Sequence, residues 1–177
     1  MRRMPSMRRL VLAGVVAALA AVGVALGTPG TGTQVPTPLA DVNTANTASM
    51  NLNHIKFRNR DPVRIFQVKT TASPGFSSGW HKHQGPVFIA VTNGSFTFYD
   101  TAGNGEHFDR AHHEDSDCTV TTVSAPGGYI ETAGEPIQVY NSTPSTVNGG
   151  VVEWTTTQVI PVGGLTRVDV TPGFCGV

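Results

Sequence analysis

The stretch Gly75–Gly94, G-F-S-S-G-W-H-K-H-Q-G-P-V-F-I-A-V-T-N-G, carries the two strongest signals in the chain. The first is a pair of histidines, His81 and His83, separated by one residue. Side chains two residues apart on a β-strand point to the same face, so both imidazoles can reach one point in space. Imidazole is a common metal ligand, and the pair predicts half of a metal site on a strand.

The second signal is the end of the same stretch. An unbroken apolar run, Val87 to Val91, is followed by Asn93-Gly94 and then by Ser95 to Tyr99. Asn-Gly between two such segments is the strongest short-range signal for a β-hairpin. The sequence therefore predicts a tight hairpin at Gly94, with residues 95–99 as the returning strand.

The composition favours an all-β fold. The 177 residues include 20 Gly and 12 Pro, Val and Thr recur through the second half, and no long segment shows helical periodicity. These features predict one domain of short strands joined by many turns. Further strands are expected at residues 63–70, 118–123, 129–131, 136–141 and 151–160.

The N-terminal part predicts export. Residues 1–27 begin with arginines, continue with the apolar run Leu10 to Leu26 and end in small residues, which is typical of a cleavable signal peptide. An uncleaved membrane anchor is the alternative, and either one places the rest of the chain outside the cytosol, secreted or at the cell envelope. Residues 28–51 are rich in Thr, Pro and Ala and predict a flexible spacer, with the domain proper at 52–177.

The charge distribution excludes one class of partner. Residues 28–177 carry 8 basic and 12 acidic side chains, a net charge of −4. No basic patch remains that could neutralise phosphates, so we expect no nucleic-acid binding. Membrane contact is expected only through an uncleaved N-terminal helix, and a homodimer is compatible with the sequence.

The chain has two cysteines, Cys118 and Cys175. Thiols of exported proteins oxidise, and an even number of cysteines can pair completely. The two are therefore expected to form a disulfide that attaches the C-terminal tail to the sheet. The alternative is two unpaired buried thiols. With two cysteines and no CxxC pair, a thiolate zinc site is excluded.

A polar segment over residues 100–117 follows the expected hairpin and contains His107, His112 and His113. Such a long segment predicts either a solvated acidic surface loop or a loop that folds over the site and adds a histidine to it.

The spacing in the opening stretch resembles the first motif of the cupin superfamily, G-x5-H-x-H-x3-E-x6-G. Gly75, His81, His83 and Gly94 fall on its positions, and Val87 stands where the glutamate should be.

A degraded copy of the second cupin motif, G-x5-P-x-G-x2-H-x3-N, follows. Gly134 and Asn141 match, Thr132 replaces the proline, and Ile137 stands where the histidine belongs. The first glycine of that motif is displaced to Gly127. The run over residues 79–87 is also similar to small secreted bacterial cupins.

The resemblance implies a cupin-type double-stranded β-helix, a jelly-roll barrel, with both histidines facing its interior. Cupins hold a divalent metal through two histidines, a glutamate and a third histidine, so the resemblance leaves His81 and His83 as metal ligands. A third ligand could come from Glu131, from a loop histidine or from a bound molecule. The alternative is a metal-free pocket with neutral, hydrogen-bonded histidines. In both cases Val87, Ile137 and Glu131 are expected to line the pocket.

Two functions follow from this reading. The first is non-catalytic binding of a small molecule in the barrel of an exported cupin-domain protein, with no firmly required cofactor. The alternative is a metal-dependent cupin enzyme, oxygenase-like or isomerase-like, that uses His81, His83 and an unidentified third ligand. No Ser-His-Asp group, phosphate loop or nucleotide fingerprint is present.

Overall fold

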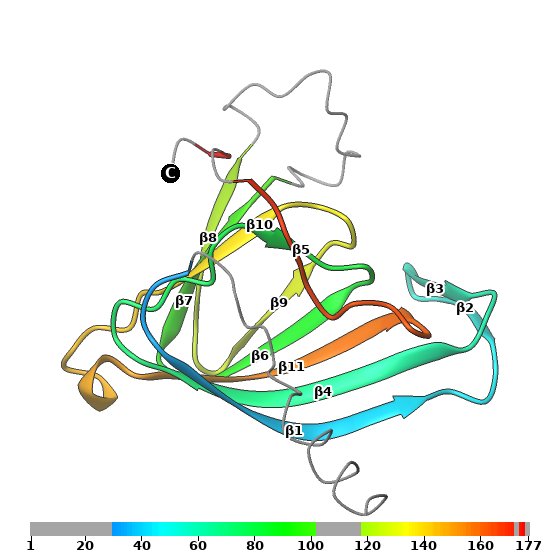
Figure 1. Cartoon of the computed structure of the whole chain (residues 1–177), viewed down its shortest axis with the longest axis horizontal. Helices are drawn as coiled ribbons and strands as arrows, with labels where there is room; N and C mark the ends of the chain where they lie inside the picture. The colour runs from blue at the N-terminus through cyan, green and yellow to red at the C-terminus, as the bar shows by residue number, and fades with distance from the viewer. Residues whose placement is uncertain (1–29, 102–117, 172–173, 176–177) are drawn as a thin grey trace, which may run out of the picture.

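Two five-stranded antiparallel sheets face each other and enclose the core (Figure 1). The structure is a computed structural model and describes residues 30–101, 118–171 and 174–175. The first sheet has the order β1 (Gln34–Asn43), β4 (Val63–Ala72), β11 (Val152–Pro161), β6 (Val87–Asn93) and β9 (Gly127–Glu131). The second has the order β12 (Val168–Asp169), β5 (His81–Lys82), β10 (Ile137–Asn141), β7 (Ser95–Asp100) and β8 (Thr119–Ser124). A hairpin of β2 (Ala48–Leu52) and β3 (Ile55–Asn59) projects beside the first sheet, and a 3₁₀ turn spans Asn148–Gly150.

Side-chain alternation decides which residues reach the interior. Along β6 the buried residues are Val87, Ile89 and Val91, and along β11 every second residue from Val152 to Ile160 is buried. Because residues directly opposite each other on paired strands share a face, these side chains form rows across the sheet. The expectation of an all-β fold of short strands is confirmed, and each strand expected at 63–70, 118–123, 129–131, 136–141 and 151–160 is present within a few residues.

The predicted hairpin at Gly94 is wrong. β6 pairs with β11 and β9, whereas β7 pairs with β10 and β8, so the two strands belong to different sheets. Gly94 is the corner between the sheets: its φ is +75°, and an added Cβ would lie 2.3 Å from Thr143 Oγ1 and 2.8 Å from the Val151 carbonyl oxygen. The Asn-Gly pair correctly marks a sharp turn, but a local pattern cannot say which sheet the next strand joins.

The prediction of a flexible spacer over residues 28–51 is also wrong over most of its length. Residues 34–43 form β1, which pairs with β4 along nearly its whole length, and residues 48–51 belong to β2. Arg64 on β4 donates Nε to Asp41 Oδ1 at 2.6 Å and Nη2 to Asp41 Oδ2 at 2.7 Å. The composition misled because an edge strand obtains its order from backbone pairing with its neighbour, so it needs few large apolar side chains of its own.

The predicted signal or anchor over residues 1–27 and the loop histidines His107, His112 and His113 lie outside the described residues. Among the residues that the structure describes, no helix has the length and apolar character needed to cross a membrane.

The C-terminal segment is tied to the second sheet, as expected. Cys118 and Cys175 form the predicted disulfide. Just before it, Phe174 packs against the buried Trp80 with ring centroids 5.2 Å apart, and the Val170 amide donates to the Trp80 carbonyl. This segment runs past β5, which is the strand that carries the first histidine (Figure 1).

Candidate metal centre and ligand cavity

His81 and His83 are brought together by β5 and the turn that follows it. His81 lies opposite Ile137 of β10 on one side and opposite Asp169 of β12 on the other. The two imidazoles are 4% and 7% exposed, and their ring centroids are 4.8 Å apart with the planes nearly perpendicular. The sequence prediction that both side chains reach one point is therefore confirmed.

Both imidazoles use Nδ1 to contact a backbone carbonyl. His81 Nδ1 lies 2.9 Å from the Gly79 oxygen, and His83 Nδ1 contacts the Thr166 oxygen. A carbonyl can only accept a hydrogen bond, so Nδ1 carries the hydrogen in each ring and Nε2 of a neutral ring keeps its lone pair. Metal-ligating histidines in proteins are oriented by contacts of this kind.

Glu131 at the end of β9 supplies a carboxylate to the same point. It is 3% exposed, and its Oε2 lies 3.1 Å from His83 Nε2. That oxygen makes no hydrogen bond with any described residue. The three side chains offer ligand atoms that all lie within 4.8 Å of one another. One carboxylate and two imidazoles meeting at this separation match the donor set of a three-ligand divalent metal site.

The electrostatics of the cluster keep His81 in its neutral form. Burial holds the pKa of His81 well below its usual value of 6.5, and the nearby positive charge of Arg167 and the His83 ring lower it further. His81 is therefore neutral near pH 7 and available as a ligand. A buried carboxylate is costly without a positive partner, and a divalent ion at this point or a proton on His83 would supply that charge.

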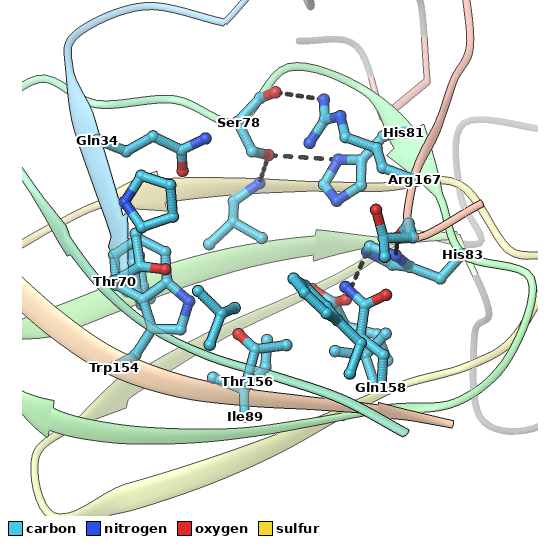
Figure 2. A pocket seen from close by; sticks show the side chains of 18 of the residues that line it. Gln34, Thr70, Ser78, His81, His83, Ile89, Trp154, Thr156, Gln158 and Arg167 are labelled. Atoms are coloured by element: carbon cyan, nitrogen blue, oxygen red, sulfur yellow. Dashed lines mark hydrogen bonds and ion pairs between the residues drawn. The ribbon is translucent and has the colours of Figure 1, made fainter. Parts of the chain in front are cut away.

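The cluster lies at one end of a cavity of about 390 Å³ between the two sheets. Figure 2 shows His81, His83, Gln158 and Arg167 at this end, with Trp154 and Thr70 at the other. The remaining wall is mostly apolar and includes Phe66, Val68, Phe76, Val87, Ile89, Phe96 and Val139. A cavity of this size and composition matches sites for small organic molecules.

The C-terminal segment closes the polar end. In addition to the Thr166 contact with His83, the Arg167 guanidinium donates Nη2 to the Ser78 carbonyl at 2.6 Å and Nε to Asp169 Oδ1 at 2.8 Å. Burial lowers the pKa of Arg167, although the neighbouring Asp169 opposes that change. The segment thus orients one histidine and places a positive charge beside the other.

The predicted site residues separate into two groups. His81, His83 and Glu131 come together, and Val87 and Glu131 line the cavity as expected. Ile137 is 2% exposed and belongs to the hydrophobic core beside His81 rather than to the cavity wall. Its side chain offers no metal-binding atom at the position where the motif resemblance expects a histidine.

Three contributors were missed from the sequence: Gln158, Arg167 and the Thr166 carbonyl. Gln158 had a readable signal, because it is a polar residue at an inward position of the alternating strand β11. The other two lie in a short segment without periodicity, where only tertiary contacts give them a role.

No family model matches the chain, and no curated protein matches it in sequence. Solved structures resemble it in fold. They include an oxalate decarboxylase from Lactobacillus farciminis in complex with formate, with 10% identity over 60% of this chain and 26% of that one and a TM-score of 0.45. A cupin domain from Bordetella pertussis has 13% identity over 75% of this chain and 98% of that one, with a TM-score of 0.42. A conserved protein of unknown function from Streptococcus pyogenes has 11% identity over 73% and 75% of the two chains, with a TM-score of 0.43.

This chain spans about a quarter of the length of the oxalate decarboxylase chain. Cupin-fold proteins are thus among the neighbours. At these identities and TM-scores the likeness carries no inference about activity or ligand.

Proposed function

We propose that the protein is an exported cupin-type protein that holds one divalent metal ion through His81, His83 and Glu131 and binds a small molecule in the adjoining cavity. The observation that carries the proposal is the buried carboxylate of Glu131, 3.1 Å from a ring nitrogen of His83 and without a hydrogen bond to its Oε2 among the described residues. An oxygen in this position is destabilising unless a cation accompanies it.

The chemistry of the donor set limits the identity of the metal. Two neutral imidazoles and a carboxylate suit zinc, manganese, iron, nickel or copper, whereas magnesium and calcium prefer oxygen ligands. Three protein ligands leave coordination positions open, and the cavity lies beside them. A bound small molecule could therefore contact the metal directly.

Binding without turnover is the function that the cavity wall supports best. Among the described lining residues outside the three ligands, Arg167 is the one ionisable side chain. An arginine stays protonated near pH 7 and makes a poor general base. The rest of the lining has no group suited to accept a proton during catalysis.

A metal-dependent enzyme is the second candidate, and one observation favours it. Two histidines and one carboxylate with open positions are the donor set of many non-haem iron oxygenases, whose chemistry is supplied by the metal rather than by a protein base. Turnover of a bound molecule under air, compared with its stability under nitrogen, would separate this candidate from simple binding.

Export is the part of the proposal that rests on the ends of the chain. The disulfide between Cys118 and Cys175 suits an oxidising compartment, and the sequence of residues 1–27 is typical of a signal. A fusion of this chain to a reporter that folds only outside the cytosol would test it. A fusion that is expressed but shows no reporter activity would refute export.

Metal stoichiometry tests the central claim. The protein is purified without chelator or nickel resin, and its metal content is measured before and after loading with zinc, manganese and iron. We expect about one ion per chain in the wild type and a loss of it in His81→Ala/His83→Ala and in Glu131→Gln. His54→Ala, which changes an exposed histidine at the tip of the β2–β3 hairpin, is the matched control and should retain the ion. If the wild type holds no metal after incubation with zinc, manganese or iron, the proposal is overturned.

A further inference from the structure

Gln158 is a buried amide in a cavity wall that is mostly apolar. It is 6% exposed, lines the cavity, and its Oε1 makes no hydrogen bond with any residue that the structure describes. A glutamine amide offers two donor hydrogens and two acceptor positions, and leaving an amide atom unpaired in a buried site is destabilising. The amide oxygen therefore has hydrogen-bonding capacity that the described residues do not use.

Strand register places this amide beside the metal centre. Gln158 on β11 lies opposite Val87 on β6, and Val87 lies opposite Glu131 on β9. Two strand spacings separate Gln158 from Glu131, roughly 10 Å between their backbones. The polar head of a molecule in the cavity would lie between the amide and the metal-binding cluster, with Val87 beneath it.

The apolar end of the cavity lies farther along the same strand. Trp154 is four residues from Gln158 on β11, a distance of roughly 13 Å. Its ring packs edge-on against Phe96, with centroids 4.6 Å apart, and a tilted Phe76 lies at 6.1 Å. This length suits one ring on a short chain that extends from the polar head.

The charges at the polar end favour an anion. The charged side chains among the described lining residues are Glu131 and Arg167, and a divalent metal adds two positive charges. Asp169 pairs with Arg167 from outside the cavity, so one net positive charge remains. Asp100 is buried near Ile137, accepts a hydrogen bond from Tyr129 and does not line the cavity.

We propose that the cavity takes a small organic anion with an apolar body. Its oxyanion lies between the metal and Arg167, and its ring packs against Phe96 and Trp154. The Gln158 amide, turned over so that Nε2 takes the place of the unpaired Oε1, donates the hydrogen bond that orients the head. This inference rests on the proposed function, because the metal supplies part of the positive charge. It makes Gln158 a ligand-contacting residue that determines specificity.

Three probes of matched shape test the ligand class. The metal-loaded protein is titrated by calorimetry with 3-phenylpropanoate, with its neutral amide 3-phenylpropanamide, and with propanoate, which keeps the charged head and lacks the ring. We expect 3-phenylpropanoate to bind at least tenfold more tightly than each of the others. If 3-phenylpropanoate binds less than tenfold more tightly than its amide, selection of an anion is refuted. If it binds less than tenfold more tightly than propanoate, the role of the apolar end is refuted. If no probe binds, both are refuted.

A pair of variants tests the role of Gln158. Gln158→Leu keeps the volume and removes the amide, so affinity for 3-phenylpropanoate should fall about tenfold while the metal content stays unchanged. Gln67→Leu is the control, because Gln67 lies at a half-buried position on β4 away from the cavity and bonds to Thr157. Unchanged affinity in Gln158→Leu would overturn this role.

The outcomes also separate this inference from the proposed function. A wild-type chain that takes up no metal refutes the proposed function before any probe is added. A chain that holds its metal in full and binds the acid and the amide equally refutes only the ligand class.

Discussion

Glu131 lies directly opposite Val87 on the neighbouring antiparallel strand, and both side chains point into the interior. Val87 occupies the motif position at which the cupin resemblance expects the metal-binding glutamate. The carboxylate missing from β6 is thus present one strand away, at the same level of the barrel and beside the same histidines. The cluster with His81 and His83 therefore contains a carboxylate from β9 and none from position 87.

An exchange of these two residues tests that relationship. We expect Glu131→Val to weaken metal binding at least 100-fold, because it leaves two imidazoles without a carboxylate. Val87→Glu combined with Glu131→Val should recover at least tenfold of that loss, since the new carboxylate lies directly across the strand pair. Affinity is measured by competition with a chromophoric chelator.

The control for the exchange is Glu153→Val, which removes a half-exposed glutamate of β11 that pairs with Lys69 on the outer face. Its metal affinity should match the wild type. Equal weakening in Glu131→Val and in the double variant would show that position 87 cannot supply a ligand.

Gly94 should be intolerant of a side chain. Gly94→Ala combines a φ of +75° with a Cβ placed 2.3 Å from Thr143 Oγ1, so we expect a loss of about 2–4 kcal/mol in the free energy of unfolding. The measurement is urea denaturation followed by tryptophan fluorescence.

Gly134→Ala provides a matched control for that substitution. Gly134 has a φ of +85°, and an added Cβ would meet nothing within 4 Å. It should lose only about 1 kcal/mol, the cost of the positive φ alone. Equal losses at the two positions would show that the close approach at the corner between the sheets has no energetic effect.

Removal of the disulfide should loosen the C-terminal segment and, through it, the metal centre. Cys118 and Cys175 are separated by 57 residues, for which the chain-entropy model gives at most roughly 4 kcal/mol of stabilisation. Cys118→Ser/Cys175→Ser should unfold at lower urea concentration and bind metal more weakly, because Thr166 orients His83 from the same segment. An unchanged metal affinity in the folded double variant would show that the segment stays in place without its disulfide.

The attachment of β1 should depend on pH through Asp41. The Arg64 guanidinium lowers the pKa of the Asp41 carboxyl below its usual 3.8, so the ionised form is favoured in the folded chain. The ion pair is therefore fully present above pH 3.8 and is lost as the pH falls through the lower folded pKa. Protection of the β1 amides, measured as the exchange rate relative to the intrinsic rate at each pH, should fall across that range in the wild type. It should stay constant in Asp41→Asn, which lacks the carboxyl.

Local patterns predicted much of this molecule. Period-two alternation located most strands of the two sheets, and the spacing of His81 and His83 placed both on one face. The cysteine count predicted the disulfide correctly. These features depend on residues close in sequence or on simple chemistry, which a single chain displays directly.

The errors came from features that depend on distant partners. Residues 34–43 lack the apolar content of an independent strand and are ordered by β4. Gly94 marks a turn, but the partners of β6 and β7 lie elsewhere in the chain. Ile137 shares a face with His81 and lies in the core beside the cavity, a distinction that depends on the packing of both sheets.

The sequence alone determined the all-β class, the histidine pair, and the apolar residues Val87 and Ile137 at the two positions where the cupin resemblance expects metal ligands. The tertiary structure decided that Glu131 joins His81 and His83 in one cluster and that Thr166 and Arg167 complete the polar end of the cavity. The physical reason is that cross-strand register brings Glu131 to within 3.1 Å of a histidine 48 positions away in the chain. Spacing along a sequence records which residues share a strand face, whereas only the pairing of strands records which faces meet.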